Sequence, residues 1–376
     1  MSDLQKPKAK RRLFLRRQLL ILALPLAGVL SFWGKANPEW VEHHYSTTFY
    51  HGLSQAVSTL TGLVPFSMAE GCIASLILFA LWMILRMIQG LRDKEQKNFD
   101  VLNRFFSTAA AIASVICLLF VMNCGLNYSR YSFTTYSGLT IRDSSAQELA
   151  ALCAELIEEA NELRPLITED ETGVTVLTAS DYETAAKTKA AFDTLSQQYP
   201  VLQGSYAQPK PVLFSKLMSY TQITGFFFPY TFEANINVAA PDYTIPATMC
   251  HELAHLRGFM REDEANFVGY LACMASEDTE LRYSGTMLAL VHSMNSLYGA
   301  DFETFCALNA LYHPGVSRDF TYNKLYWHQF EGAVAQVSDK INDTYLKVNH
   351  QTDGVKSYGR MVDLLLADYR ARHGLT

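Results

Sequence analysis

Three long apolar runs constrain the fold more than any other feature of the sequence. A bilayer core about 30 Å thick is crossed by about 20 apolar residues, and runs of this kind cover residues 13–34, 71–91 and 105–126. The alternatives are a cleaved signal peptide for the first run and a buried core helix for the second. Because no small-x-small cleavage site follows residue 34, we favour an uncleaved anchor. We therefore predict three transmembrane helices.

The distribution of Lys and Arg predicts the orientation of these helices. The tail 1–12 and the connection 92–104 are rich in Lys and Arg, whereas the connection 35–70 contains only Lys35. Basic connections stay on the cytoplasmic side of a membrane. The sequence thus predicts a multi-pass protein of the cytoplasmic membrane with a cytoplasmic N-terminus. Residues 35–70 and the unit 127–376 are expected on the extracytoplasmic side.

Composition excludes several classes of function. A formal net charge of −6 argues against a nucleic-acid partner, because phosphate binding needs a dense basic surface. Membrane lipid is the expected partner, since 49% of the residues are hydrophobic and only 18% are charged. The seven cysteines are widely spaced and form no CxxC pair, which argues against a disulfide framework or a cysteine zinc site.

The unit 127–376 is expected to be mainly α with a small β element, an α+β fold. Ser145–Leu163 begins with a Ser-Ala-Gln-Glu capping pattern, and Asp181–Gln198 and Phe214–Ile223 also follow helical spacing. The stretch Tyr230–Ala239, which follows Phe-Phe-Phe-Pro, alternates polar and apolar residues and is the best strand candidate.

Residues 251–255 read His-Glu-Leu-Ala-His. On a helix, His251 and His255 lie one turn apart on the same face, so both imidazoles can bind one Zn²⁺ ion. Glu252 lies at the edge of that face, where a carboxylate can act as general base without binding the metal. The helix is expected to begin near Thr244 and to end at Gly258 in a left-handed conformation.

The third metal ligand is expected among the acidic residues that follow Gly258. A second helix from Glu262 to Ala275 would place Glu262 and Asn266 on one face, so that Glu262 binds the metal and Asn266 orients a ligand. Glu264 is the main alternative ligand, or else a residue beside the site, and Asp263 is a weaker candidate.

Several sequence blocks resemble a known group of proteins. They are Gly225–Pro241, HELAH with GFMREDEANF, and Tyr345–Leu366. These blocks are similar to an uncharacterised family of bacterial membrane proteins that have N-terminal membrane helices and a zincin-like domain. The pattern Glu262-x-x-Ala-Asn is also similar to a gluzincin signature in which the first glutamate binds zinc. One departure is that only six residues separate His255 from Glu262, and a metzincin-type third histidine would fall at Arg261.

The resemblance implies that the strand is an edge over the cleft, able to pair with an extended peptide. Glu233, Asn235 and Asn237 share one face of that strand, either as substrate contacts or as exposed polar residues.

Stabilisation of the transition state needs a further His, Tyr or Arg. The candidates are Tyr358, Arg360 and Tyr345, with alternatives elsewhere in the unit (His292, His313 and His328). The expected activity is that of a zinc metallopeptidase acting on a peptide or protein substrate at the outer membrane face. The alternatives are hydrolysis of a cell-wall amide and a non-catalytic zinc-containing binding or sensory module.

Overall fold

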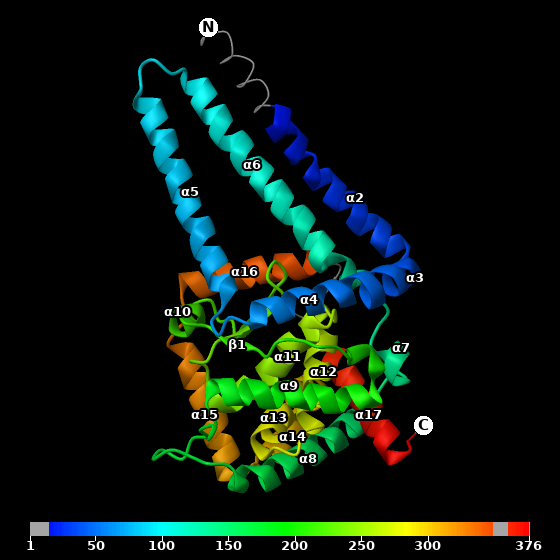
Figure 1. Ribbon diagram of the computed structural model, residues 1–376. Helices are drawn as coiled ribbons and strands as arrows, with labels where there is room; N and C mark the ends of the chain where they lie inside the picture. The colour runs from blue at the N-terminus through cyan, green and yellow to red at the C-terminus, as the bar shows by residue number, and fades with distance from the viewer. Residues whose placement is uncertain (1–14, 349–359, 376) are drawn as a thin grey trace.

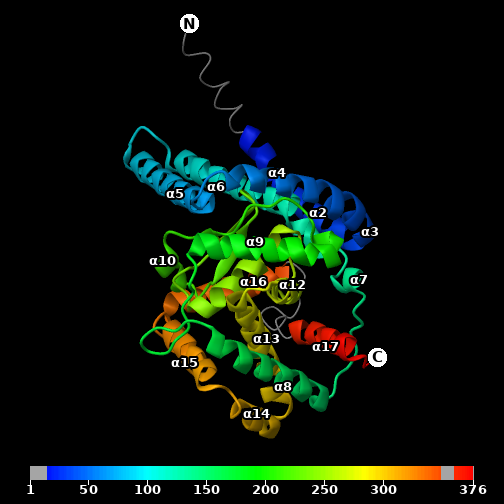
Figure 2. The ribbon, with the colours of Figure 1, turned by 60° about the horizontal axis from the view of Figure 1, so that its bottom comes forward.

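The computed structural model describes residues 15–348 and 360–375 of the protein. Three long apolar helices extend from one end of a helical domain that contains a small sheet (Figure 1). The domain lies at the opposite end from the loop that joins the second and third helices (Figure 2). This mainly α architecture with a small β element confirms the predicted fold class.

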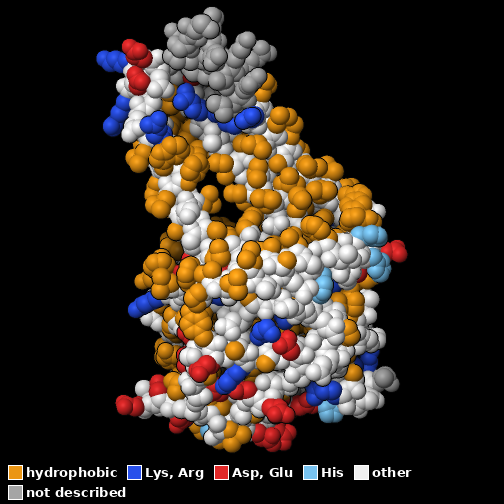
Figure 3. Space-filling model, in the orientation of Figure 1, with side chains coloured by type: hydrophobic (Ala, Val, Ile, Leu, Met, Phe, Trp, Pro, Cys, Tyr) orange, Lys and Arg blue, Asp and Glu red, His pale blue; other side chains and the backbone are white. Residues whose placement is uncertain are grey.

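The three predicted membrane helices are present. The first spans Leu15–Ala36 and includes α2 (Ala23–Ala36), the second is α5 (Met68–Arg92) and the third is α6 (Asn98–Asn123). Each is long and apolar enough to cross a membrane. Helix α6 contacts both of the others. Many of their hydrophobic side chains are exposed and form the hydrophobic surface in the upper half of the molecule (Figure 3).

The connection between the first two membrane helices is itself helical and lies across the top of the domain (Figure 1). It consists of α3 (Pro38–Trp40), the π-helix η1 (Val41–Tyr50) and α4 (His51–Gly62). Glu42 of η1 forms a buried ion pair with Arg130, with 3.0 Å between Oε1 and the guanidinium. The Tyr50 hydroxyl donates to the carbonyl of His255 at 3.2 Å. The connection is therefore attached to the helix that carries the HELAH motif.

The domain is built from helices whose ends follow local signals. The Ser145–Glu148 capping box predicted from the sequence is present at the start of the first long helix of the domain. The helices are α7 (Thr134–Ser137), α8 (Ala146–Leu163), α9 (Asp181–Gln198), α10 (Ser215–Ser219), α11 (Ile245–Leu256), α12 (Glu262–Met274), α13 (Thr279–Ala300), α14 (Phe302–Asn309), α15 (Pro314–His328), α16 (Ala333–Val348) and α17 (Arg360–His373), with short 3₁₀ turns at Gly125–Ser129, Arg164–Leu166, Pro200–Leu202 and Asp242–Thr244. Residues 214–223 thus form a shorter helix than predicted.

The sheet has three strands in the order β1-β3-β2. Strand β1 (Lys210–Pro211) pairs parallel to β3 (Glu233–Ile236), and β2 (Gly225–Phe228) pairs antiparallel to β3 with Phe226 opposite Asn235. The expected single strand 230–239 is therefore shorter and belongs to a hairpin. Phe232, with φ of 51°, lies in the turn between β2 and β3. The strand order makes β1 and β2 the edge strands, and β3 is central.

The three polar side chains expected to contact substrate lie in β3 or directly after it, and each is buried in contacts with neighbouring elements. Glu233 accepts hydrogen bonds from the backbone nitrogens of Met68 (3.2 Å) and Ala69 (2.9 Å), at the start of α5. It also forms a buried ion pair of 2.5 Å with Lys210. The Asn235 Oδ1 accepts from Ser67 at 2.6 Å.

Asn237 in turn donates to the Ser219 hydroxyl at 3.0 Å and is fully buried. The structure therefore does not bring Glu233, Asn235 or Asn237 to a cleft. Glu233 and Asn235 instead hold the start of α5 against the sheet. The Glu233 carboxylate accepts from N–H groups of the first helical turn, which is the positive end of the helix dipole.

Replacing Glu233 with alanine is expected to destabilise the protein by about 3–5 kcal/mol, because Lys210 is left as a buried, unpaired charge. Thermal unfolding in detergent or nanodiscs measures the change, and Glu158→Ala on the exposed face of α8 is the control. Equal unfolding midpoints for the two variants would contradict the anchoring role of Glu233.

Candidate metal centre

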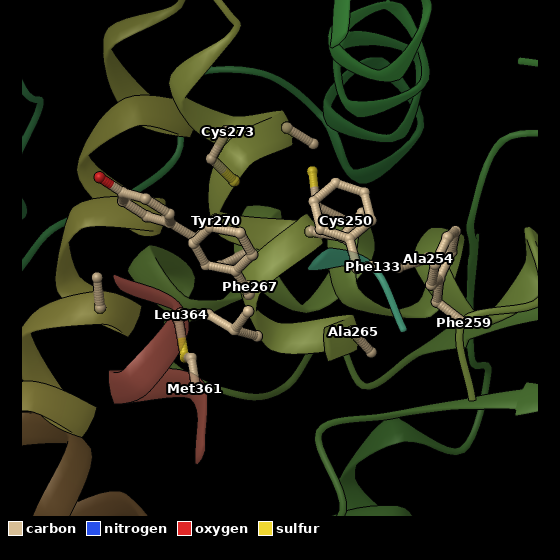
Figure 4. Close-up of a cluster of buried hydrophobic side chains, with 14 of the residues drawn as sticks. Phe133, Cys250, Ala254, Phe259, Ala265, Phe267, Tyr270, Cys273, Met361 and Leu364 are labelled. Atoms are coloured by element: carbon tan, nitrogen blue, oxygen red, sulfur yellow. The ribbon is translucent and has the colours of Figure 1, made fainter. Parts of the chain in front are cut away.

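Helix α11 carries the HELAH motif into the interior of the domain. Pro246 occupies its first turn, and the helix ends before Gly258, whose φ of 89° is the predicted left-handed conformation. Thr244 is at the N-cap position, but its hydroxyl donates to the carbonyl of Pro241 at 2.7 Å and does not cap the helix. Behind the motif, Cys250 and Ala254 pack into the hydrophobic core (Figure 4).

Helix α12 returns beside α11 and begins at Glu262, as predicted. The two helices approach closely because Gly269 lies against the backbone of α11. A Cβ atom at this position would be 3.1 Å from the backbone nitrogen of His251. The close contact of the two helices is stabilised on the core side of α12, where Phe133, Ala265 and Phe267 pack together (Figure 4).

The two histidines and Glu262 form a cluster with the geometry of a metal site. The Nε2 atoms of His251 and His255 lie 3.3 Å and 3.6 Å from the two Glu262 carboxylate oxygens. One ligand atom from each residue lies within 4.8 Å of the others. Tetrahedral zinc with bonds of about 2.0–2.1 Å separates its ligand atoms by roughly 3.4 Å. The three donors therefore fit an ion of this size.

The remaining imidazole nitrogens are held by neighbouring groups. His251 Nδ1 lies 2.8 Å from Asn266 Oδ1, and His255 Nδ1 lies 2.8 Å from the carbonyl oxygen of Phe259. Because both partners are acceptors, each Nδ1 carries a proton and each Nε2 presents a lone pair when the ring is neutral. This is the arrangement typical of metal-binding histidines. The pairing of Asn266 with a ligand is the one expected from its spacing to Glu262.

The buried charges of the cluster shift its pKa values in opposite directions. Burial opposes the charge on His251, but the hydrogen bond and negative charge of Glu262 outweigh it and raise the pKa of His251 to about 9. Burial and the neighbouring positive charge of His251 lower the pKa of His255 to about 4. Without a metal, the cluster therefore holds a proton on His251.

Glu252 lies beside the cluster but outside it. Its side chain is 3% exposed, and its Oε2 has no hydrogen-bond partner among the residues that the structure describes. Burial raises the pKa of Glu252 to about 8, against the opposing effect of His251. The backbone of Phe227 in β2 slightly offsets this rise in the pKa. A carboxylate with a pKa near neutrality and a free oxygen is suited to proton transfer.

The cluster and Glu252 line a cavity of about 650 Å³. Strand β2 forms one wall, and residues from the end of α6 and from α16 form another. Two tyrosines meet in this wall, since the hydroxyls of Tyr128 and Tyr345 are 2.8 Å apart. Tyr345 was a candidate from the sequence. Tyr128 was missed, because it follows the third apolar run without any local motif.

The other predicted site residues lie apart from the cluster. Glu264 is buried and accepts from the backbone nitrogen of Phe133 at 2.8 Å and from Arg261 at 2.5 Å, so it supports the fold beside the site. Arg360 begins α17 and is not among the residues that line the cavity, and Tyr358 lies outside the described residues.

The three alternative histidines also lie apart from the described lining of the cavity. His292 is half-buried on α13, and burial together with the charge of His251 lowers its pKa to about 4. His313 accepts a hydrogen bond from the backbone nitrogen of Gly315, and His328 pairs with the exposed Glu331.

Comparison with known proteins identifies a family. No curated protein and no solved structure matches the chain. The family described as "Protein of unknown function (DUF3810)" matches residues 45–366, a range that contains the second and third membrane helices and the whole His251–His255–Glu262 cluster. The chain therefore belongs to the DUF3810 family of proteins of unknown function.

Proposed function

We propose that the protein is a membrane-anchored zinc metallopeptidase with a zincin-like site. The observation that carries this proposal is the position of Glu252 beside, but not within, the His251–His255–Glu262 cluster. Structural zinc is closed by four protein ligands, whereas catalytic zinc has three and keeps one position open. The three donors found here, next to a buried free carboxylate and a cavity, support the catalytic arrangement.

A zinc ion held by His251, His255 and Glu262 would polarise the scissile carbonyl and make an adjacent water more acidic. The protein supplies the proton transfers. Glu252 accepts the proton of the attacking water at Oε2 and passes it to the leaving amine. Burial raises the pKa of Glu252 to about 8, and a neighbouring cation would lower it, so the carboxylate can accept a proton and return it near neutral pH.

The edge of the sheet supports a peptide substrate over other amides. Strand β2 is one of the two edge strands, and its residues Gly225, Phe226 and Phe227 line the cavity beside Glu252. An edge strand presents backbone groups that can pair with an extended chain. The predicted role of an edge over the cleft is thereby assigned to β2 and not to the strand that contains Glu233.

We assign stabilisation of the developing oxyanion to Tyr128 and Tyr345, in place of Tyr358 and Arg360. Both hydroxyls belong to residues that line the cavity. Burial raises the pKa of each tyrosine above its ordinary value, so both remain protonated; one hydroxyl donates to the other, and the accepting hydroxyl can donate its own proton to the oxyanion. The basic connection 92–104 supports an extracytoplasmic position of the domain in this proposal.

Purified protein is expected to contain one zinc ion per chain, measured by metal analysis. His255→Ala and Glu262→Gln remove a ligand and should each lose most of that zinc. Asp263→Asn and Glu264→Gln are the matched controls from the same helix turn, because neither carboxylate belongs to the cluster. Zinc loss in a control, with zinc retained in Glu262→Gln, would contradict the assigned ligand set.

Zinc affinity is expected to increase with pH up to about pH 9. Neutral His251 is the binding form, and below its pKa of about 9 each zinc ion must displace one proton. The apparent affinity should then fall about tenfold for each pH unit below that value. Competition titrations with a zinc chelator measure it. An affinity that stays constant between neutral pH and pH 9 would show that His251 carries no proton in the metal-free site.

Glu252→Gln is expected to keep its zinc and lose peptide cleavage by on the order of 10²–10⁴-fold, the usual contribution of a general base. The test is a peptide-library digestion by protein in nanodiscs, analysed by mass spectrometry, with the exposed Glu277→Gln as control. If wild type and Glu252→Gln contain zinc and give the same fragments, the site is not a peptidase and a non-catalytic zinc role is favoured.

A further inference from the structure

Helix α16 (Ala333–Val348) has three distinct faces. Ala335 is buried and Asn342, seven residues later, lines the cavity, so this face packs on the domain. The charged and amide side chains Gln336, Lys340 and Asp343 share a second face. The third face is apolar and exposed, with Val334, Val337 and Ile341 accessible by 56%, 56% and 65%.

A second exposed apolar group surrounds the short helix α10 (Ser215–Ser219). Leu213 is 81% and Leu217 is 67% exposed, and Phe214 and Tyr220 are exposed beside them. Figure 3 shows hydrophobic side chains continuing from the membrane helices onto the side of the domain where α10 lies. We call these residues, together with the apolar face of α16, the apolar rim (Leu213, Phe214, Leu217, Tyr220, Val334, Val337 and Ile341).

Contacts place the apolar rim at the ends of the membrane helices. The Glu70 carboxylate, in the first turn of α5, accepts from the backbone nitrogens of Leu213 (2.9 Å) and Phe214 (3.0 Å). At the other end of α16, the ring of Tyr345 lies 5.9 Å from that of Phe120 in α6. Figure 1 shows α16 crossing between these two helix ends.

Helix α10 and the start of α16 are also joined to each other. The Tyr220 ring lies 5.0 Å from that of Phe330, just before α16, and the hydroxyls of Ser219 and Tyr326 are 2.6 Å apart. The rim is thus one surface that runs from the start of α5 to the end of α6.

We propose that the apolar rim is immersed in the interface of the same bilayer that α2, α5 and α6 cross. A helix with one apolar and one charged face lies in the membrane plane with its apolar side about 5–10 Å deep among the lipids. The rim is continuous with the lipid-facing helices, and the charges of α16 lie on a different face, so lipid is the occupant that the surface fits.

This placement brings one wall of the cavity to the membrane surface. Phe120 at the end of α6 and Asn342 and Tyr345 of α16 all line the cavity. The position of the apolar rim in the bilayer does not depend on the proposed peptidase activity, so it can be tested without measuring catalysis.

The experiment measures the depth of fluorescent labels on neighbouring residues of α16. Single cysteines replace Val337 or Ile341 on the apolar face, and Gln336 or Lys340 on the charged face as matched controls. The exposed native thiols are first removed by Cys72→Ala, Cys117→Ala and Cys306→Ala. Each protein is labelled with a nitrobenzoxadiazole dye in nanodiscs. Quenching is measured with nitroxide-bearing lipid and with aqueous iodide.

The proposal predicts that labels at Val337 and Ile341 are quenched by the nitroxide lipid and are several-fold less sensitive to iodide than labels at Gln336 and Lys340. Val334 is a further apolar position if a variant does not fold. Equal iodide sensitivity at all positions would place α16 in water. Protection of Val337 and Ile341 from both quenchers would show that a second protein surface covers them. Either result would overturn the proposal.

Discussion

The close packing of α12 against α11 is the interaction on which the candidate site depends. Glu262 reaches the imidazoles of His251 and His255 only because Gly269 lets the two helices approach. The left-handed turn at Gly258 reverses the chain between them within a few residues. A short connection of this kind leaves little freedom in the position of Glu262. The geometry of the donors is therefore set by backbone packing and not by a flexible loop.

The membrane part and the site are structurally connected. The π-helix η1 belongs to the connection between the first two membrane helices. It holds the end of α11 through Tyr50 and through the buried Glu42–Arg130 pair. Arg130 also donates to the carbonyl of Arg257 at 3.2 Å, at the C-cap of α11. Glu233 joins the sheet to the start of α5. These contacts make the membrane helices part of the scaffold of the domain, and not only an anchor.

Local signals in the sequence predicted the three membrane helices, the domain helices α8, α9, α11 and α12, and the centre of the site. Capping residues such as Ser145, helical spacing in HELAH and the glycine at 258 act through neighbouring backbone groups, so they can be recognised without the tertiary structure. Helical periodicity also predicted that Glu262 and Asn266 share the face of α12 that meets the metal ligands. Tertiary contacts decided the rest. The alternation of residues 230–239 could not show that β3 would be central, so Glu233, Asn235 and Asn237 were expected at a cleft and are instead buried anchors. Tyr128 reaches the cavity through packing that no local pattern indicates.

The most direct test of the metal centre is X-ray absorption at the zinc edge of the purified protein. Two imidazole nitrogens from His251 and His255 and oxygen from Glu262 should give a first shell of nitrogen and oxygen at about 2.0–2.1 Å, with the multiple scattering of two imidazoles. Sulfur at about 2.3 Å, scattering from a different number of imidazoles, or protein that binds no zinc would contradict the account.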